Sequence, residues 1–354
     1  MLISCLTFRK IIPIIILLML LVSCQMKSYP KDYEQLSDEE RIVIRLSHVV
    51  GENTPKGLAS RYFAEKVKER TDGYVEVQVF PNSKLYKDGE ELDALIDGDI
   101  QMIIPATSKI TPLVPEWQVI DLPFAFADVY EIYDYLGSPA GKVLKKKLEE
   151  EGMYPLVFWD NGFKQMTNNE NPLHKPEDFT DLQFRVMSSE VLVEQFALLD
   201  ADAKIETFDQ VFSNLEKEKV NAQENTFSNI VNKNMYDVQE YITVSNHGYL
   251  GYLVLMNADF WHSLPDDIQV IILDVLDETT EWEIEVAQEV NEESYQVLKD
   301  CHCIDIHELN KEEQQSWEEA LEPLYDYFAE RYGAQYIEYL PKYETKKEDK
   351  IEDE

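Results

Sequence analysis

Residues 182–190 read LQFRVMSSE, and this stretch predicts a β-strand followed at once by a helix start. The apolar residues around Arg185 are typical of a strand, and Ser188 or Ser189 is placed to cap the helix. Arg185 offers a fork of N–H donors that matches a carboxylate in two bonds, and the first N–H groups of a helix add a favourable dipole. The stretch is therefore typical of a carboxylate-binding site, although an arginine on an exposed strand edge would give the same pattern.

The rest of the chain alternates short apolar runs with amphipathic helical patterns, which favours an α/β fold with largely parallel strands. Besides the strand around residue 185, we expect strands at residues 42–46, 75–80, 101–104, 156–159, 221–223 and 251–256. We expect helices at residues 56–70, 90–97 and 190–199, a further helix started by Thr207 with Gln210 as capping-box partner, and a long helix from 263–266 to about 300.

The length of 354 residues and the hydrophobic content of 44% suggest about two domains of ordinary size. Two similar sets of strands and helices predict two lobes. We place lobe I at residues 41–162 and 251–290, and lobe II at 163–250 and 291–341. The long helix is able to cross from one lobe to the other; coiled-coil pairing is its alternative, but charges interrupt the apolar seam.

The two ends of the chain differ from this folded body. Residues 1–23 have the basic start, short apolar core and small-residue end of an export signal. The string LVSC at 21–24 resembles the bacterial lipobox, which implies cleavage before Cys24 and lipid attachment to it; a simple secretory signal or an uncleaved anchor is the alternative. We expect residues 24–40 to form a tether and 342–354 a charged tail.

The formal net charge of −37 makes nucleic acid and anionic lipid surfaces poor partners. Screening confines the repulsion of an anionic solute to about 10 Å at 0.1 M salt, so a few local cations can outweigh it. Cys301 and Cys303 flank a histidine, but a structural zinc site needs four ligands at wider spacing. We therefore predict no metal and no cofactor, and leave free thiols or a local bridge open for this pair.

Four strings fall in order within 70 residues: FWDNGFKQ at 158–165, PEDF at 176–179, FRVMSS at 184–189 and QENT at 223–226. Together they resemble the solute-binding proteins of TRAP transporters, in a form closest to the DctP branch, whose members bind C4-dicarboxylates. DLPF at 121–124 and NHGYLG at 246–251 fit the same family. The resemblance covers roughly residues 42–335 and implies a two-lobed periplasmic-binding-protein-like (Venus flytrap) fold, with the long helix bridging the lobes.

By this resemblance Arg185 is the arginine that grips the solute carboxylate, Asn225 the asparagine that orients it, and Phe208 an aromatic wall residue. Lys164 stands where many relatives outside the dicarboxylate branch carry arginine. A lysine there is suited to meet the second carboxylate of a dicarboxylate. The alternative for Lys164 is a solvated loop cation, and the alternative for Asn225 is a cap of the helix starting near Thr226.

Several further candidates come from the residues themselves. His48 follows the first expected strand, and Thr54 and Lys56 stand at a helix start, so they predict an anion-facing edge of lobe I. A structural histidine is the alternative for His48. Thr107 and Ser108 follow the third expected strand and are able to donate hydroxyl hydrogen bonds, although such residues commonly serve a turn.

The resemblance therefore implies an extracytoplasmic, lipid-anchored receptor that captures malate, succinate or fumarate and delivers it to the small and large membrane subunits of a TRAP permease. Another organic acid, such as a keto, aromatic or sugar acid, and a sensory co-receptor are the alternatives. No nucleophile elbow, Walker loop, zinc-protease motif or dinucleotide fingerprint occurs, so we predict that the protein is not an enzyme.

Overall fold

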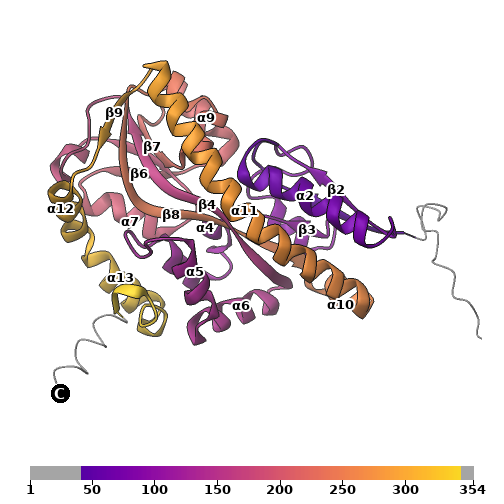
Figure 1. Cartoon of the computed structure of the whole chain (residues 1–354). Helices are drawn as coiled ribbons and strands as arrows, with labels where there is room; N and C mark the ends of the chain where they lie inside the picture. Colours follow the sequence, from indigo (N-terminus) through magenta and orange to yellow (C-terminus); the bar gives the residue numbers. More distant parts are fainter. Residues whose placement is uncertain (1–40, 344–354) are drawn as a thin grey trace, which may run out of the picture.

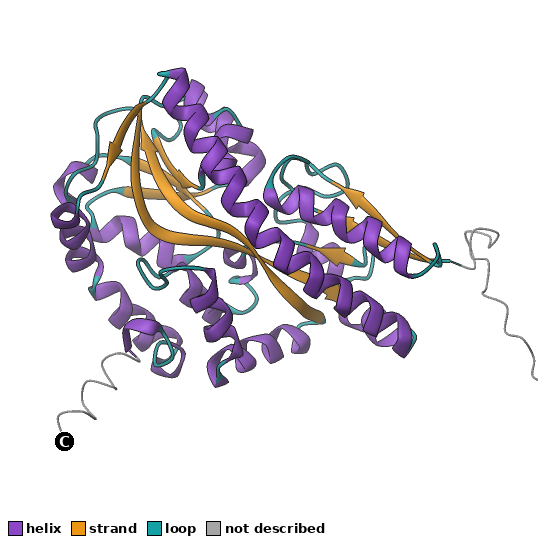
Figure 2. Ribbon diagram, viewed as in Figure 1, coloured by secondary structure: helices purple, strands orange, loops and turns teal. Residues whose placement is uncertain are grey.

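The structure is a computed structural model that describes residues 41–343. Its strands form one nine-stranded sheet in the order β2-β1-β3-β8-β4-β7-β5-β6, with β9 paired to β8 (Figures 1 and 2). The strands are β1 (Ile42–Ser47), β2 (Val75–Phe80), β3 (Met102–Ile103), β4 (Met153–Asn168), β5 (Gln183–Val186), β6 (Asp202–Ile205), β7 (Ala222–Asn225), β8 (Tyr241–Asn257) and β9 (Asp305–Glu308). The predicted signal, the lipidation site Cys24, the tether and nearly all of the charged tail lie outside the described residues.

Helices cover the sheet and fill the connections between its strands. They are α2 (Pro55–Arg70), α3 (Glu91–Ile96), α4 (Thr107–Ile110), α5 (Val129–Gly137), α6 (Pro139–Glu150), α7 (Glu190–Leu198), α8 (Val211–Glu216), α9 (Phe227–Asn232), α10 (Ala258–Ser263), α11 (Asp266–Cys301), α12 (Lys311–Leu321) and α13 (Pro323–Tyr332). Short 3₁₀ turns are η2 (Pro115–Asp121), η3 (Pro176–Phe179), η4 (Phe208–Gln210), η5 (Met235–Asp237) and η6 (Ala334–Tyr336). Within residues 41–343, no helix combines the length and the apolar character that crossing a membrane requires.

The expectation of a largely parallel sheet holds only for its outer strands. β1 pairs in parallel with β2 and β3, and β5 pairs in parallel with β6 and β7. The two longest strands, β4 and β8, run antiparallel to each other along nearly their whole length. The apolar runs at 156–159 and 251–256 are therefore only parts of long strands, and polar residues of the same strands concealed how far they extend.

β4 and β8 link the β1–β2–β3 part of the sheet to the β5–β6–β7 part (Figure 1). Their register shifts at three places, between Pro155 and Val157, between Asp160 and Gly162, and between Lys164 and Met166. Such shifts let a strand bend. The middle shift, where Asp160 pairs with Gly251 and Gly162 pairs with Leu250, lies next to the predicted lobe boundaries at 162 and 251. The boundaries themselves stay a prediction.

The long helix α11 has 36 residues, so it is about 54 Å long at 1.5 Å per residue. It lies across the sheet and contacts α2, β4 and α9 (Figure 1). The indole Nε1 of Trp159 donates to Thr280 Oγ1 at 3.0 Å, and Asp160 N donates to Glu283 Oε2 at 2.9 Å. These bonds fix the helix to the bent region of β4, and the helix spans the range that the sequence predicts.

Two predicted helix caps are right in position but wrong in their hydrogen bonds. Ser189 is the N-cap residue of α7, but its side chain makes no capping hydrogen bond. The Ser189 hydroxyl donates instead to Gln118 Oε1 at 3.2 Å, because η2 packs against this helix start. Thr207 likewise forms no capping box with Gln210, since the chain makes the 3₁₀ turn η4 before α8 begins at Val211.

Candidate functional site

A narrow cavity of about 30 Å³ lies where the ends of strands from both parts of the sheet meet. Segments of predicted lobe I supply one side of its lining, and segments of predicted lobe II the other. The lining residues are Val49, Val50, Lys56, Asp88, Glu91, Pro105, Ala106, Lys109, Arg185, Met187, Phe208, Asn225, Asn229, Leu250 and Tyr252. Of the predicted site residues, the structure thus brings Arg185, Asn225, Phe208 and Lys56 together around one space.

The guanidinium of Arg185 is the largest buried cation of this cavity. The side chain is 1% exposed, and its Nε donates to the backbone oxygen of Glu206 at 2.9 Å. Its Nη2 is buried and has no hydrogen-bond partner within the described residues. A buried unpaired donor on a charged group is unfavourable unless something accepts its hydrogen bond, so Arg185 is suited to receive an anion.

Two lysines add positive charge from the lobe I side. Lys109 Nζ lies 2.9 Å from Asp88 Oδ2, and Asp88 Oδ2 also accepts the backbone N–H of Phe208 at 2.7 Å. Lys56 Nζ donates to the backbone oxygen of Ile104 at 2.8 Å and lies 3.8 Å from the ring centroid of Tyr252. Burial lowers the pKa of Lys56 to about 8, so its ammonium stays mainly charged at neutral pH.

Glu91 is the second acid of the cavity. Burial raises its pKa to about 7, against the opposing effects of Lys56 and of the Ser47 hydroxyl, which donates to Glu91 Oε1 at 2.8 Å. Burial therefore weakens the negative charge of Glu91 at neutral pH. The lining has three basic residues, Arg185, Lys56 and Lys109, and two acids, Asp88 and Glu91. The cavity therefore has a net positive charge, although the chain as a whole is strongly acidic.

Asn225 and Phe208 occupy the lobe II side of the cavity. Asn225 ends β7, and its Oδ1 accepts from Asn229 Nδ2 at 2.8 Å and from the backbone N–H of Thr226 at 3.2 Å. The amide of Asn225 is thus held in one orientation at the cavity wall. The alternative role predicted for Asn225 is to cap the following helix. The N-cap residue of that helix, α9, is Thr226 and not Asn225.

Lys164 lies in a different environment. It is buried, its Nζ is 2.6 Å from Glu224 Oε1, and Glu224 Oε2 is 2.8 Å from His247 Nε2. Burial by itself would raise the pKa of Glu224, but Lys164 and His247 outweigh it and lower this pKa to about 2. Lys164 is not a solvated loop cation, and it does not line the cavity. Its predicted contact with a second ligand carboxylate stays a prediction.

The side chains of His48, Thr107 and Ser108 are buried. They are neighbours in the sequence of residues that line the cavity, but they do not line it themselves. Neither ring nitrogen of His48 has a hydrogen-bond partner within the described residues, and burial lowers the pKa of His48 to about 3. Ser108 donates to Asp121 Oδ1 at 2.9 Å. Their predicted roles in ligand binding also stay predictions.

Sequence reasoning missed Lys109, Asp88, Glu91 and Tyr252. Lys109 directly follows the predicted pair Thr107 and Ser108, and the structure shows that this segment is the short helix α4. A helical interpretation of residues 107–110 would have drawn attention to the lysine. The pairing of Lys109 with Asp88 gives no signal in the sequence, because the two residues lie far apart along the chain.

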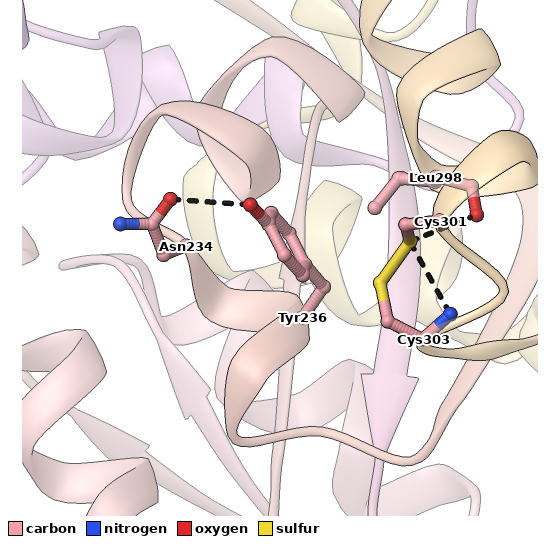
Figure 3. Close-up of a disulfide and its surroundings, with 5 residues drawn as sticks. All are labelled: Asn234, Tyr236, Leu298, Cys301 and Cys303. Atoms are coloured by element: carbon pink, nitrogen blue, oxygen red, sulfur yellow. Dashed lines mark hydrogen bonds between the residues drawn. A yellow bond between two sulfur atoms is a disulfide. The ribbon is translucent and has the colours of Figure 1, made fainter.

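The two cysteines of the described chain form a disulfide bond, Cys301–Cys303, at the end of α11 (Figure 3). This settles the open choice between free thiols and a local bridge. The bridge borders a wide polar groove with many acidic side chains. An anion would be repelled there, which supports the smaller cavity around Arg185 as the anion site.

Residues 46–331 match the family model described as bacterial extracellular solute-binding protein, family 7 (DctP). The chain belongs to this family. The DctP-family chain is thus a binding protein and not an enzyme, and it carries the mixed α/β fold of periplasmic binding proteins with a long helix, in agreement with the predicted two-lobed architecture. The family places it on the extracytoplasmic side, as the sequence predicts.

Two curated relatives of this DctP-family chain share more than 40% of its residues over the matched stretch. The chain is 42% identical over 312 residues to the C4-dicarboxylate-binding protein DctB of Bacillus subtilis, which covers 88% of this chain and 89% of the relative. It is 44% identical over 299 residues to the C4-dicarboxylate-binding periplasmic protein DctP of Rhodobacter capsulatus, with 84% and 90% covered.

Solved structures give the same picture. A TRAP periplasmic solute-binding protein from Sulfurospirillum deleyianum with bound succinate superposes with a TM-score of 0.80 at 40% identity, covering 84% of this chain and 97% of the other. A TRAP periplasmic solute-binding protein from Pseudomonas aeruginosa with bound L-malate has a TM-score of 0.78 at 34% identity, with 81% and 99% covered.

Proposed function

We propose that this DctP-family protein is the extracytoplasmic receptor of a TRAP-type transporter and captures a C4-dicarboxylate such as succinate, malate or fumarate. The observation that carries the proposal is the buried guanidinium of Arg185, which has an unpaired Nη2 and lines a cavity of net positive charge. One carboxylate of the ligand would take the free donor of Arg185, and Asn225 would orient it. The names of the relatives at 42% and 44% identity support a dicarboxylate.

The partner of the second ligand carboxylate is less well defined than the partner of the first. Lys109 lines the same cavity as Arg185, and it is the lysine of the lining that already pairs with an acid. We infer that the distal carboxylate of the ligand either replaces Asp88 as the partner of Lys109 or contacts Lys56. Lys164, the residue that the sequence suggests for this contact, is engaged by Glu224 instead.

A monocarboxylic acid is the second candidate ligand. A sugar acid binding protein from Advenella mimigardefordensis in complex with galactonate has a TM-score of 0.81 at 30% identity to this chain. Such a ligand would need only the Arg185 contact and hydrogen bonds in place of the second charge. Competition between succinate and galactonate for the purified protein distinguishes the two candidates.

Titration calorimetry tests the proposal. We expect succinate or malate to bind one to one, and Arg185→Ala to weaken binding several hundredfold, because losing one partner of a buried charge pair costs about 3–5 kcal/mol. Arg185→Lys should also bind poorly, because a point charge does not reproduce the guanidinium fork. Arg331→Ala, which removes a surface arginine, is the control and should bind normally. Near-normal affinity in Arg185→Ala would refute the proposal.

We further propose that the mature chain is held at the membrane by lipid on Cys24 and hands its ligand to the small and large permease subunits. The lipobox-like string at 21–24 supports the anchor. In cells, the wild type should partition with membranes and Cys24→Ser should not. Solute uptake that requires both the receptor and the permease would separate transport from the alternative of a sensory co-receptor.

A further inference from the structure

Two histidines and a glutamate from three separate segments meet on the surface, away from the Arg185 cavity. His174 lies in the connection between β4 and η3, His307 lies on β9, and Glu313 is in the first turn of α12. One nitrogen from each histidine and a carboxylate oxygen of Glu313 all lie within 4.8 Å of one another. None of the three residues lines the cavity around Arg185.

The geometry brings the right atoms together. His174 Nδ1 lies 2.9 Å from Glu313 Oε1, and His307 Nε2 lies 3.0 Å from Glu313 Oε2. The two imidazole rings are in contact, with centroids 3.9 Å apart. Small shifts of these side chains would place an ion among the three groups with bonds of about 2.0–2.2 Å, the usual length for zinc to histidine or carboxylate.

A purely structural explanation accounts for only part of the cluster. Glu313 completes a capping box with Asn310, since its Oε2 accepts the Asn310 N–H at 2.9 Å. That role needs neither histidine. Two imidazoles beside one carboxylate form a donor set that divalent transition metals prefer. The set is open to solvent, because the His174 side chain is about half exposed.

We propose that His174, His307 and Glu313 bind a divalent transition metal ion, with Zn²⁺ as the best-matched species and solvent completing the coordination. This departs from the prediction of no metal, which rests on Cys301 and Cys303, because these three residues come together only in the folded chain. Each histidine would turn the lone pair of its inward nitrogen to the metal and keep its proton on the outer nitrogen. Glu313 would provide one oxygen to the ion and keep the other for Asn310. The site is separate from ligand capture and does not depend on the proposed function.

The metal would strengthen a junction at which His174 and His307 already contact Glu313. η3 is attached to α12 through the edge-to-face contact of Phe179 with Trp317, and β9 is attached to β8 by parallel pairing. An ion held by His174, His307 and Glu313 would link all three segments at one point. It should therefore raise resistance to unfolding and leave succinate affinity unchanged, because all three ligands belong to predicted lobe II.

Calorimetry with Zn²⁺ on untagged, chelator-treated protein tests the site. We expect one equivalent to bind to the wild type and to raise its melting temperature, because a ligand of the native state stabilises that state. His174→Ala and His307→Ala should each weaken Zn²⁺ binding at least about tenfold. Glu313→Gln keeps an oxygen for the Asn310 N–H but removes the charge, and it should weaken binding as well.

Three matched controls make the result decisive. His262→Ala removes an exposed histidine outside the cluster and should bind Zn²⁺ as the wild type does. A Cys301→Ser, Cys303→Ser double variant should also retain the metal, which excludes thiol binding. All variants should bind succinate with wild-type affinity, so failure of the metal site is distinguishable from failure of the receptor proposal. Absence of one-to-one binding, or binding that survives both histidine substitutions, would overturn the inference.

Discussion

Lys164 and Glu224 form an ion pair in which both side chains are removed from water. We predict that Lys164→Met lowers the free energy of unfolding by about 3–5 kcal/mol, because it leaves the carboxylate of Glu224 buried with only His247 beside it. Urea denaturation at neutral pH measures the loss. If succinate affinity of the still-folded variant is unchanged, the predicted contact of Lys164 with the ligand is wrong.

The matched control is an ion pair in solvent. Lys146 and Glu150 are 3.5 Å apart with side chains 75% and 62% exposed. Lys146→Met should change the free energy of unfolding by no more than about 0.5 kcal/mol, since exposed pairs contribute little. An equal effect at both lysines would contradict the assignment of Lys164 to a buried pair.

For single residues, the sequence predicts a site residue best where few roles explain the side chain. Arg185 interrupts an apolar strand, and the structure removes the alternative of an exposed strand edge because the side chain is 1% exposed. Lys164 looks much like Lys109 in the sequence, because both are lysines beside polar residues. Their different environments arise from Glu224 and Asp88, which approach them only in the folded chain.

Among the elements, the β4–β8 pair depends on a glycine that has no room for a side chain. A Cβ added at Gly251 would lie 1.9 Å from Phe158 Cζ on the neighbouring strand. We predict that Gly251→Ala lowers the free energy of unfolding by about 1–3 kcal/mol, the usual effect of overpacking. Gly137→Ala, where nothing lies within 4 Å, should be close to neutral, and Phe158→Leu should restore part of the loss in Gly251→Ala. Urea denaturation compares the variants, and loss without rescue would contradict the steric explanation.

The contact of α11 with β4 predicts a pH dependence. Burial, and then the charge of nearby Asp160, raise the pKa of Glu283 well above its ordinary value. A raised folded-state pKa gives stability that is fully present below the unfolded pKa of about 4.5 and is lost as pH rises through the folded value. We therefore predict that Glu283→Gln is more stable than the wild type at pH 8, and that the difference disappears near pH 4.

Chemical denaturation at a series of pH values measures this difference. The Glu283→Gln side chain would keep an oxygen for the Asp160 N–H, so the hydrogen bond of the wild type is retained. Glu281→Gln removes an exposed acid from the same helix, so it serves as the control and should follow the wild-type profile. A pH-independent difference between Glu283→Gln and the wild type would contradict the prediction.

The sequence predicts well those elements whose residues follow one periodic pattern from end to end. β2 occupies residues 75–80 as expected, and α11 extends over nearly the expected range. The sequence predicts β4 only over 156–159, because the polar residues after Trp159 do not look like a buried strand. They are buried because each finds a partner, as when Asn161 donates to Thr226 and Gln165 donates to Asn246. Such side-chain pairing across the sheet leaves no periodic signal.

For the whole molecule, the net charge of −37 opposes the approach of a dianion. We predict that the association rate constant for succinate rises between about 10 mM and about 150 mM NaCl, because the Debye length falls from roughly 30 Å to 8 Å and the repulsion is screened. Stopped-flow tryptophan fluorescence measures the rate. A rate that falls with salt would show that local cations such as Lys109 attract the ligand at long range.

β4 and β8 pass without interruption through both parts of the sheet, hydrogen-bonded to each other near each of their ends. A rotation of one part against the other must therefore flex a paired ribbon, in contrast to proteins whose halves are connected by slack single-chain linkers. A paired ribbon bends along few directions, so the empty receptor has a small set of open shapes. Because such a receptor loses little conformational entropy when its two parts close, more of the free energy of its contacts with the solute is retained as affinity.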